Sequence, residues 1–217
     1  MKRFLLNALK GIPSTIQLVL AITTLVLTYN IGKEQNVISS LQYSPVFIFN
    51  IEQLFRKDYT PTQSEKFEII NEGYPVNNFY SDIDSIMEIT FYFKGEFHRN
   101  KLKIDYFSVQ SRKSGGKERM SGGIGENNIS MFSSLKSKLQ ESLTEKGAKQ
   151  IAFSFEHLTK ISYSDMDQVE SEMYFLNSER VKRDVYVKSL EGVDRFYIVS
   201  LYEPNVDEIT SKLLLSN

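Results

Sequence analysis

The sequence predicts a mainly β (α+β) protein with one N-terminal transmembrane helix, followed by a β-sandwich or small β-barrel domain that carries one amphipathic helix. Three observations favour this fold class: residues 11–32 carry no formal charge, later segments alternate apolar and polar residues, and the 15 Phe and 12 Tyr favour strands. We expect an N-terminal segment with the span over 1–32, a stalk over 33–42 and a β-rich soluble domain over 43–217.

The uncharged segment is long enough to cross a bilayer. Residues 11 to 32, 22 in all, would extend about 33 Å as a helix, which matches the hydrocarbon core. A cleaved signal peptide is the alternative, but the apolar run ends in residues 28–32 (TYNIG) without small residues in an A-x-A-like pattern. We therefore expect a retained single-pass anchor in a bacterial inner membrane, with membrane lipid as a partner.

The charges that flank the span bear on its orientation. Lys2, Arg3 and Lys10 precede it, and only Lys33 follows it closely. The positive-inside rule then places the N-terminus in the cytoplasm and the domain outside. The bias is small and a short tail can be moved, so the side of the domain stays open.

Small and polar residues recur along the span at intervals of three and four, which places them on one face of a helix. Helices in lipid use such faces to approach one another, so the pattern predicts a homo-oligomer; chance composition is the alternative. A narrow water pore lined by Gln17, Thr24 and Thr28 is a further hypothesis. The seam or pore residues are Ser14, Gln17, Ala21, Thr24 and Thr28.

Short alternating segments predict the strands of the domain. Lys94-Gly95-Glu96 predicts a hairpin turn, and an apolar phase that slips at Phe107 and Val109 predicts a β-bulge. The expected strands are 46–51, 67–69, 87–93, 102–106, 151–155, 161–163, 173–176, 184–188 and 196–202.

An apolar stripe at helical spacing predicts the amphipathic helix. Asn128 or Ser130 is expected to cap its start and Gly147 its end, and a shorter helix is expected to begin at Asn205. The stripe consists of Ile129, Phe132, Leu135, Leu139 and Leu143.

The composition argues against several chemistries. The chain has no cysteine, which excludes disulfides, thiol catalysis and cysteine-based zinc sites. His98 and His157 lie far apart in the sequence, and no Gly-x-Ser-x-Gly motif occurs. We expect no enzymatic activity, no cofactor and no metal, although carboxylate pairs on separate strands stay open.

A basic, glycine-rich stretch is the candidate ligand site. Residues 94–119 contain eight Lys or Arg and three Asp or Glu, and Ser114–Gly125 is glycine-rich. The default reading is a mobile surface loop; the functional reading is a site for an anionic ligand such as a nucleotide or oligonucleotide. Tyr106 would stack a base, and the formal net charge of −1 argues against duplex DNA. The cationic candidates are Lys101, Lys103, Arg112, Lys113, Lys117 and Arg119.

The layout resembles bacterial single-pass membrane proteins in which a helix precedes a proline-containing extended segment and a β-sandwich. The resemblance rests on Pro45 with residues 46–49, on residues 67–75 (FEIINEGYP) and on Tyr163-Ser164-Asp165. In layout alone it is also similar to nucleotide-sensing membrane effectors of antiphage defence. The first resemblance implies anchoring and fold; the second implies a nucleotide-gated pore or membrane-disrupting effector.

Two functions follow as hypotheses. The first is a non-catalytic, self-associating membrane protein that senses or binds a ligand, which in its nucleotide version needs a cytoplasmic domain. The second is an outward-facing structural or assembly subunit of the cell envelope.

Overall fold

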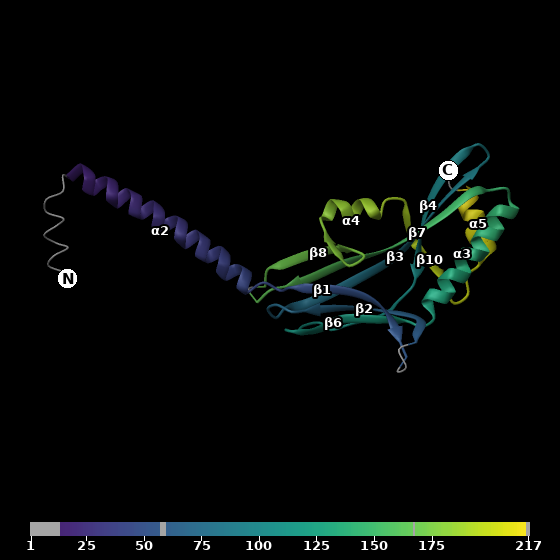
Figure 1. Cartoon of the computed structure of the whole chain (residues 1–217), viewed down its shortest axis with the longest axis horizontal. Coiled ribbons are helices and arrows are strands. Elements are labelled where there is room, and N and C mark those ends of the chain that lie inside the picture. The colour runs from purple at the N-terminus through teal and green to yellow at the C-terminus, as the bar shows by residue number, and fades with distance from the viewer. Residues whose placement is uncertain (1–13, 57–59, 167, 216–217) are drawn as a thin grey trace. The chain divides into compact units, whose positions relative to one another are not determined.

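The computed structural model describes residues 14–56, 60–166 and 168–215, and the chain divides into two compact units, 1–44 and 45–217. In the first unit, helix α2 (Ser14–Gln42) runs for 29 residues (Figure 1). The stalk expected over 33–42 is therefore the last part of this helix. Within α2, Ile16–Asn36 is long and apolar enough to cross a membrane, a property that anchors share with signal sequences.

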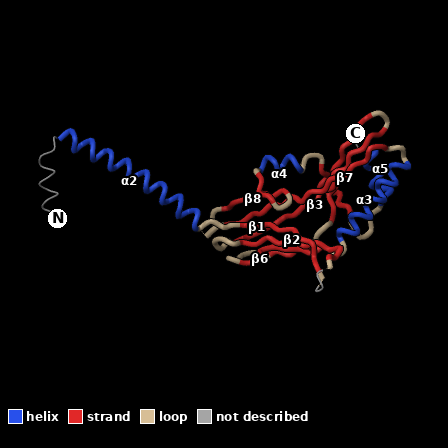
Figure 2. The backbone as a smooth tube through the Cα atoms, viewed as in Figure 1, coloured by secondary structure: helices blue, strands red, loops and turns tan. Residues whose placement is uncertain are grey.

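The described strands of the second unit form two sheets (Figure 2). A four-stranded antiparallel sheet has the order β1-β2-β6-β5, and a six-stranded sheet has the order β10-β4-β3-β7-β8-β9, in which only β10 and β4 are parallel. The bounds are β1 (Phe47–Phe55), β2 (Pro61–Asn71), β3 (Asn77–Phe93), β4 (Glu96–Asp105), β5 (Ser108–Ser111), β6 (Glu118–Gly125), β7 (Lys149–Ser164), β8 (Glu170–Leu176), β9 (Glu179–Val181) and β10 (Val193–Ser200).

Aromatic side chains join the two sheets face to face. The ring of Phe47 in β1 lies 5.6 Å from that of Phe79 in β3 and 5.2 Å from that of Tyr163 in β7, between centroids. Phe49 lies 6.0 Å from Phe175 of β8 by the same measure. Since the described strands form two separate sheets, the predicted sandwich is confirmed and the alternative of a closed barrel is wrong.

The hairpin between β3 and β4 turns at Lys94 and Gly95, as predicted. Both residues have a positive φ, 50° and 97°, which a two-residue type I′ turn requires. The turn sets Phe93 opposite Glu96 and fixes a register that places Ser85 opposite Ile104.

Two helices extend the core beyond the four-stranded sheet. Helix α3 (Asn128–Glu145) contacts β2, β7 and helix α5 (Val206–Leu215). Of the predicted apolar stripe, Ile129 is half-buried and the other four residues are buried, and Gly147 follows the helix with a φ of 92°. At the start of α5, the Asn205 Oδ1 accepts a hydrogen bond of 3.2 Å from the Glu208 N–H, so the predicted cap is confirmed.

Asn128 has a different role from the predicted cap. The N-cap of α3 is Asn127, and its side chain makes no capping hydrogen bond. Asn128 is buried, and its Oδ1 accepts a hydrogen bond of 2.9 Å from the Glu65 N–H of β2. Its side chain therefore ties the start of α3 to the four-stranded sheet.

The segment 184–188 is a helix, so the predicted strand is wrong. Helix α4 (Arg183–Ser189) buries one aromatic side chain, Tyr186, against Ile86, Leu158 and Tyr174 on the outer face of the six-stranded sheet. Val185 and Val187, whose alternation suggested a strand, are exposed. The strands expected at 151–155 and 161–163 are parts of one long strand, β7.

The apolar phase slip at Phe107 marks a change of sheet and not a β-bulge. The chain leaves the six-stranded sheet at Asp105 and enters the four-stranded sheet at Ser108. Tyr106 and Phe107, which connect the two strands, are both buried. Two consecutive side chains enter the core because the connection passes between the layers.

The default reading expected the glycine-rich segment to be a surface loop. Part of the segment is instead a strand. Residues 118–125 form β6, which pairs with β2 on one side and β5 on the other. A Cβ at Gly123 would lie 2.5 Å from the Phe67 Cε1 and closer still to the Ser108 carbonyl oxygen. The glycine is therefore needed because the neighbouring strand and a core ring leave no room.

We predict that Gly123→Ala lowers the free energy of unfolding by about 1–3 kcal/mol, because the methyl group forces the backbone or Phe67 to move. Gly116→Ala is the matched control, since its Cβ would meet only Pro75, at 3.4 Å. Chemical denaturation followed by circular dichroism measures both. Equal stabilities of the two variants would contradict this account of β6.

Candidate functional site

Four of the predicted cationic residues lie on β6 and on the segment that joins it to β5. Arg112 forms an ion pair with Glu118, and Arg119 lies 3.4 Å from the Glu68 carboxylate. Lys113 and Lys117 are exposed, and neither forms an ion pair among the described residues. The segment therefore presents two unpaired lysines instead of a dense basic surface.

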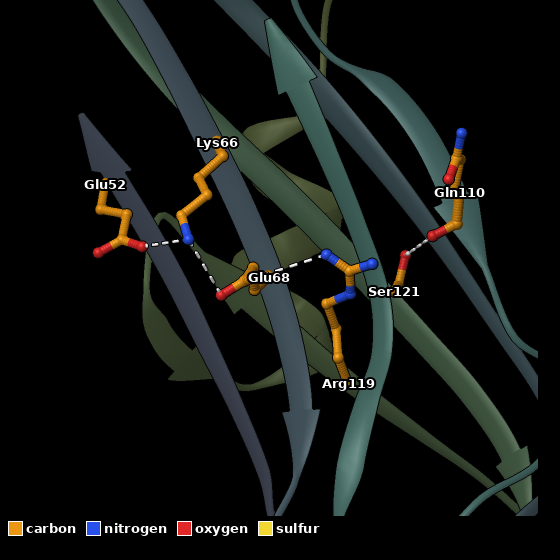
Figure 3. A network of polar contacts seen from close by, with 6 residues as sticks. All are labelled: Glu52, Lys66, Glu68, Gln110, Arg119 and Ser121. Atoms are coloured by element: carbon orange, nitrogen blue, oxygen red, sulfur yellow. Dashed lines mark hydrogen bonds and ion pairs between the residues drawn. The ribbon is translucent and has the colours of Figure 1, made fainter. Parts of the chain in front are cut away.

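The outer face of the four-stranded sheet carries a ladder of alternating charges (Figure 3). The Lys66 Nζ lies 2.6 Å from the Glu52 carboxylate and 3.5 Å from that of Glu68, which also meets Arg119. The hydrogen bond to Glu52 raises the pKa of Lys66 above its usual value. Because these cations are matched by neighbouring carboxylates, the ladder offers little attraction for an anion.

Lys101 and Lys103 lie on the six-stranded sheet, away from the four residues above. The Lys101 Nζ donates a hydrogen bond of 2.8 Å to the carbonyl oxygen of Ser189, the last residue of α4. Lys103 forms an ion pair with Asp84 of β3. The predicted residues are thus distributed over two sheets and do not converge on one site.

Tyr106 does not offer a ring face for stacking. It is buried, its hydroxyl donates a hydrogen bond of 2.8 Å to the Glu65 carboxylate, and burial raises its pKa above the ordinary value. Its ring packs against Phe107 and Phe155, at 4.9 and 4.8 Å between centroids. The stacking hypothesis required an exposed ring and is wrong on this point.

A cleft of about 550 Å³ beside α4 is a more coherent binding site. Arg99 and Glu88 form an ion pair of 2.8 Å within it, and the hydrogen bond of Lys101 ties it to the end of α4. With three acidic and three basic side chains, the cleft suits a polar ligand that carries charges of both signs. It is lined by Glu88, Arg99, Lys101, Glu156, Val185, Lys188, Ser189, Glu191 and Gly192.

Sequence reasoning found only Lys101 of this cleft. Its other charged residues come from β3, β4, β7, α4 and the segment after α4, which are spread widely along the chain. On the strands, Glu88 and Glu156 alternate with core residues. In the sequence they therefore resemble ordinary solvent-facing positions of a strand. Only the sheet register and the position of α4 bring these groups together.

The predicted seam residues of α2 share one shallow groove. Gln17, Ala21, Thr24 and Thr28 line it together with Leu20 and Leu25, while the side chain of Ser14 lies outside the described residues. The Thr24 hydroxyl donates to the Leu20 carbonyl oxygen and the Thr28 hydroxyl to that of Thr24, each at 2.8 Å. Both threonine hydroxyl protons are used within the helix. The groove therefore offers a second helix a close approach over small residues, and these two hydroxyls offer it no free hydrogen-bond donor.

His157 lies inside the domain, in surroundings that its sequence position did not reveal. Its Nδ1 is 2.9 Å from the Ser85 Oγ, and its ring packs against Tyr106, Phe107 and Phe155. Burial lowers the pKa of His157 to about 4, so the imidazole is neutral at pH 7.

No protein-family model and no curated protein matches the chain. Any inference about the function of the protein therefore has to come from the geometry of its own residues.

We predict that the domain loses stability as the pH falls from about 6.5 to about 4. An unfolded histidine binds a proton near pH 6.5, whereas folded His157 resists protonation until about pH 4. The unfolded state therefore gains protons first, which costs the folded state up to about 3 kcal/mol. Denaturation curves across this pH range measure the loss.

One variant identifies the group responsible. His157→Gln is expected to flatten the pH dependence over this window. A wild-type stability that stays constant between pH 6.5 and 4 would contradict a buried neutral His157.

Proposed function

We propose that this protein is a non-catalytic, membrane-anchored binding protein that self-associates through α2. The observation that carries the proposal is the apolar stretch Ile16–Asn36, none of which is buried. Its 21 residues extend about 31 Å as a helix, close to the thickness of a bilayer's hydrocarbon core. Exposed leucines and isoleucines along this length are stable in lipid and costly in water.

The continuity of α2 supports an anchor over a cleaved signal sequence. A signal peptide has a short apolar region followed by small residues at the cut. Here the helix continues to Gln42, well beyond the apolar window that ends at Asn36. The polar end of the helix would leave the membrane as a rigid stalk.

Self-association is supported by a repeat on the grooved face of α2. The residues that line this face follow one another at spacings of 4, 3 and 4 positions, and the same series of spacings then repeats. The pattern has a period of 11 residues, which favours a right-handed supercoil of associated helices. The second set continues the groove beyond the apolar window and includes Gly32, where an added Cβ would meet no atom within 4 Å apart from the helix's own backbone. The repeated positions are Gln17, Ala21, Thr24 and Thr28, then Thr28, Gly32, Gln35 and Ser39.

The mixed-charge cleft beside α4 is the proposed binding site of the domain. Its balanced charges favour a ligand with both signs, such as a segment of a partner protein. The nucleotide version, a nucleotide-gated pore or membrane-disrupting effector in antiphage defence, would instead depend on the exposed Lys113 and Lys117 and on a cytoplasmic domain.

A second candidate function is an outward-facing structural or assembly subunit of the cell envelope. The charges around the span favour it, since Lys2, Arg3 and Lys10 precede the apolar stretch and Lys33 alone follows it closely. This function needs the anchor and the sandwich but no soluble ligand.

We predict that the chain stays with membranes after a sodium carbonate wash, because a helix embedded in lipid is held by its apolar surface and not by ionic contacts that carbonate disrupts. Protease added to intact spheroplasts then separates the two functions. Digestion of the domain supports the outward-facing subunit, and protection until lysis supports a cytoplasmic binding protein. Release of the whole chain by carbonate would contradict both candidate functions, because each requires a membrane anchor.

We predict that Gln17→Leu combined with Thr24→Leu reduces the oligomer in detergent, since the first change removes a polar amide from the groove and the second adds bulk to it. Val19→Leu combined with Val26→Leu changes side-chain size two positions away, on the other side of the helix, and should leave assembly unchanged. Sedimentation in a density-matched detergent measures the mass. A monomeric wild-type chain, or equal oligomers for both double variants, would count against the groove as a seam.

A further inference from the structure

A second, smaller cavity opens in the six-stranded sheet, beside the connection that leads from it to the four-stranded sheet. It has a volume of about 200 Å³ and lies where β4 ends, between β3, β10 and the connection through Tyr106 and Phe107. An enclosed space of about 150 Å³ is enough for benzene in a protein interior. This cavity therefore has room for one ring-sized molecule. It is lined by Ile83, Ser85, Lys103, Ile104, Asp105, Tyr106, Phe107 and Ile198.

One residue of the lining carries a buried hydroxyl. Ser85 is 3% exposed, and its Oγ lies 2.9 Å from the His157 Nδ1. A serine hydroxyl has one donor and two acceptor sites, so a single hydrogen bond to His157 leaves at least one acceptor site. Because Ser85 also lines the cavity, that site is available to a molecule inside it.

The walls and rim restrict the ligand further. Ile83, Ile104 and Phe107 make the walls largely apolar, and the half-exposed Ile198 stands on the outer side. Lys103 is neutralised by Asp84, and Asp105 adds a negative charge. The cavity therefore offers an anion no unpaired positive charge, whereas an uncharged ring can be buried against its apolar walls.

We propose that this cavity binds an uncharged, ring-sized molecule whose single hydroxyl or N–H group donates a hydrogen bond to the Ser85 Oγ. The site is distinct from the mixed-charge cleft, with which it shares no lining residue. The domain would thus combine a surface cleft for a charged ligand with an internal pocket for a small one. His157 is a positioning residue, since it orients the Ser85 hydroxyl from behind.

The test uses two probes that share a fluorinated ring and differ by one hydroxyl group, 4-fluorophenol and fluorobenzene, with the full-length chain in lipid nanodiscs. Fluorine NMR relaxation, corrected with empty nanodiscs, reports binding to the protein. We expect 4-fluorophenol to bind more tightly than fluorobenzene. Ser85→Ala should weaken 4-fluorophenol by about five-fold and leave fluorobenzene unchanged.

Two further variants keep the result interpretable. Ser108→Ala removes an exposed hydroxyl on β5 and should change neither affinity. Ile198→Trp fills the outer part of the cavity from a half-exposed position, where it is tolerated by the fold, and should abolish binding of both probes. A cavity that holds only water would show no protein-dependent relaxation with either probe, and that result, or binding unaffected by Ile198→Trp, overturns the proposal.

Discussion

The pairing of β3 with β7 is the constraint on which the domain depends. The two strands pair from Asn77 opposite Ser164 to Tyr92 opposite Lys149, so they run through the whole six-stranded sheet. On one face Phe79 and Tyr163 meet β1, and further along β7 contacts α3. On the other face Ile86 and Leu158 support α4. One antiparallel pair thus supplies the base for the second sheet and both helical layers.

This constraint also positions the polar groups. On the core side the register sets Ser85 opposite His157, and on the outer side it sets Ile86 opposite Glu156, next to Glu88 of the cleft. The same sheet therefore holds a neutral imidazole inside and a charged cleft outside. The four-stranded sheet is joined to it by hydroxyls as well as by rings: the Ser81 Oγ of β3 donates to the Ser121 Oγ of β6 at 2.8 Å.

Local signals in the sequence were enough for the apolar helix, most strands, the Lys94-Gly95 turn, α3 and α5, because each depends on nearby residues. They failed where the partner is distant. Residues 184–188 are helical because Tyr186 reaches the outer face of a sheet formed much earlier in the chain. Residues 118–125 form a strand because they pair with β2 and β5, and position 123 requires glycine because Ser108 and Phe67 leave no room for a side chain. Arg112 and Arg119 resembled an anion site because nothing in the sequence places Glu118 and Glu68 beside them.

The account of function depends on whether the apolar helix remains part of the mature protein. Intact mass spectrometry of the chain purified from its native host tests this most directly. A mass close to the 25.1 kDa of the whole chain, recovered from the membrane fraction, is the predicted result. A protein whose first residue lies beyond Gly32, or one recovered in the soluble fraction without detergent, would contradict it.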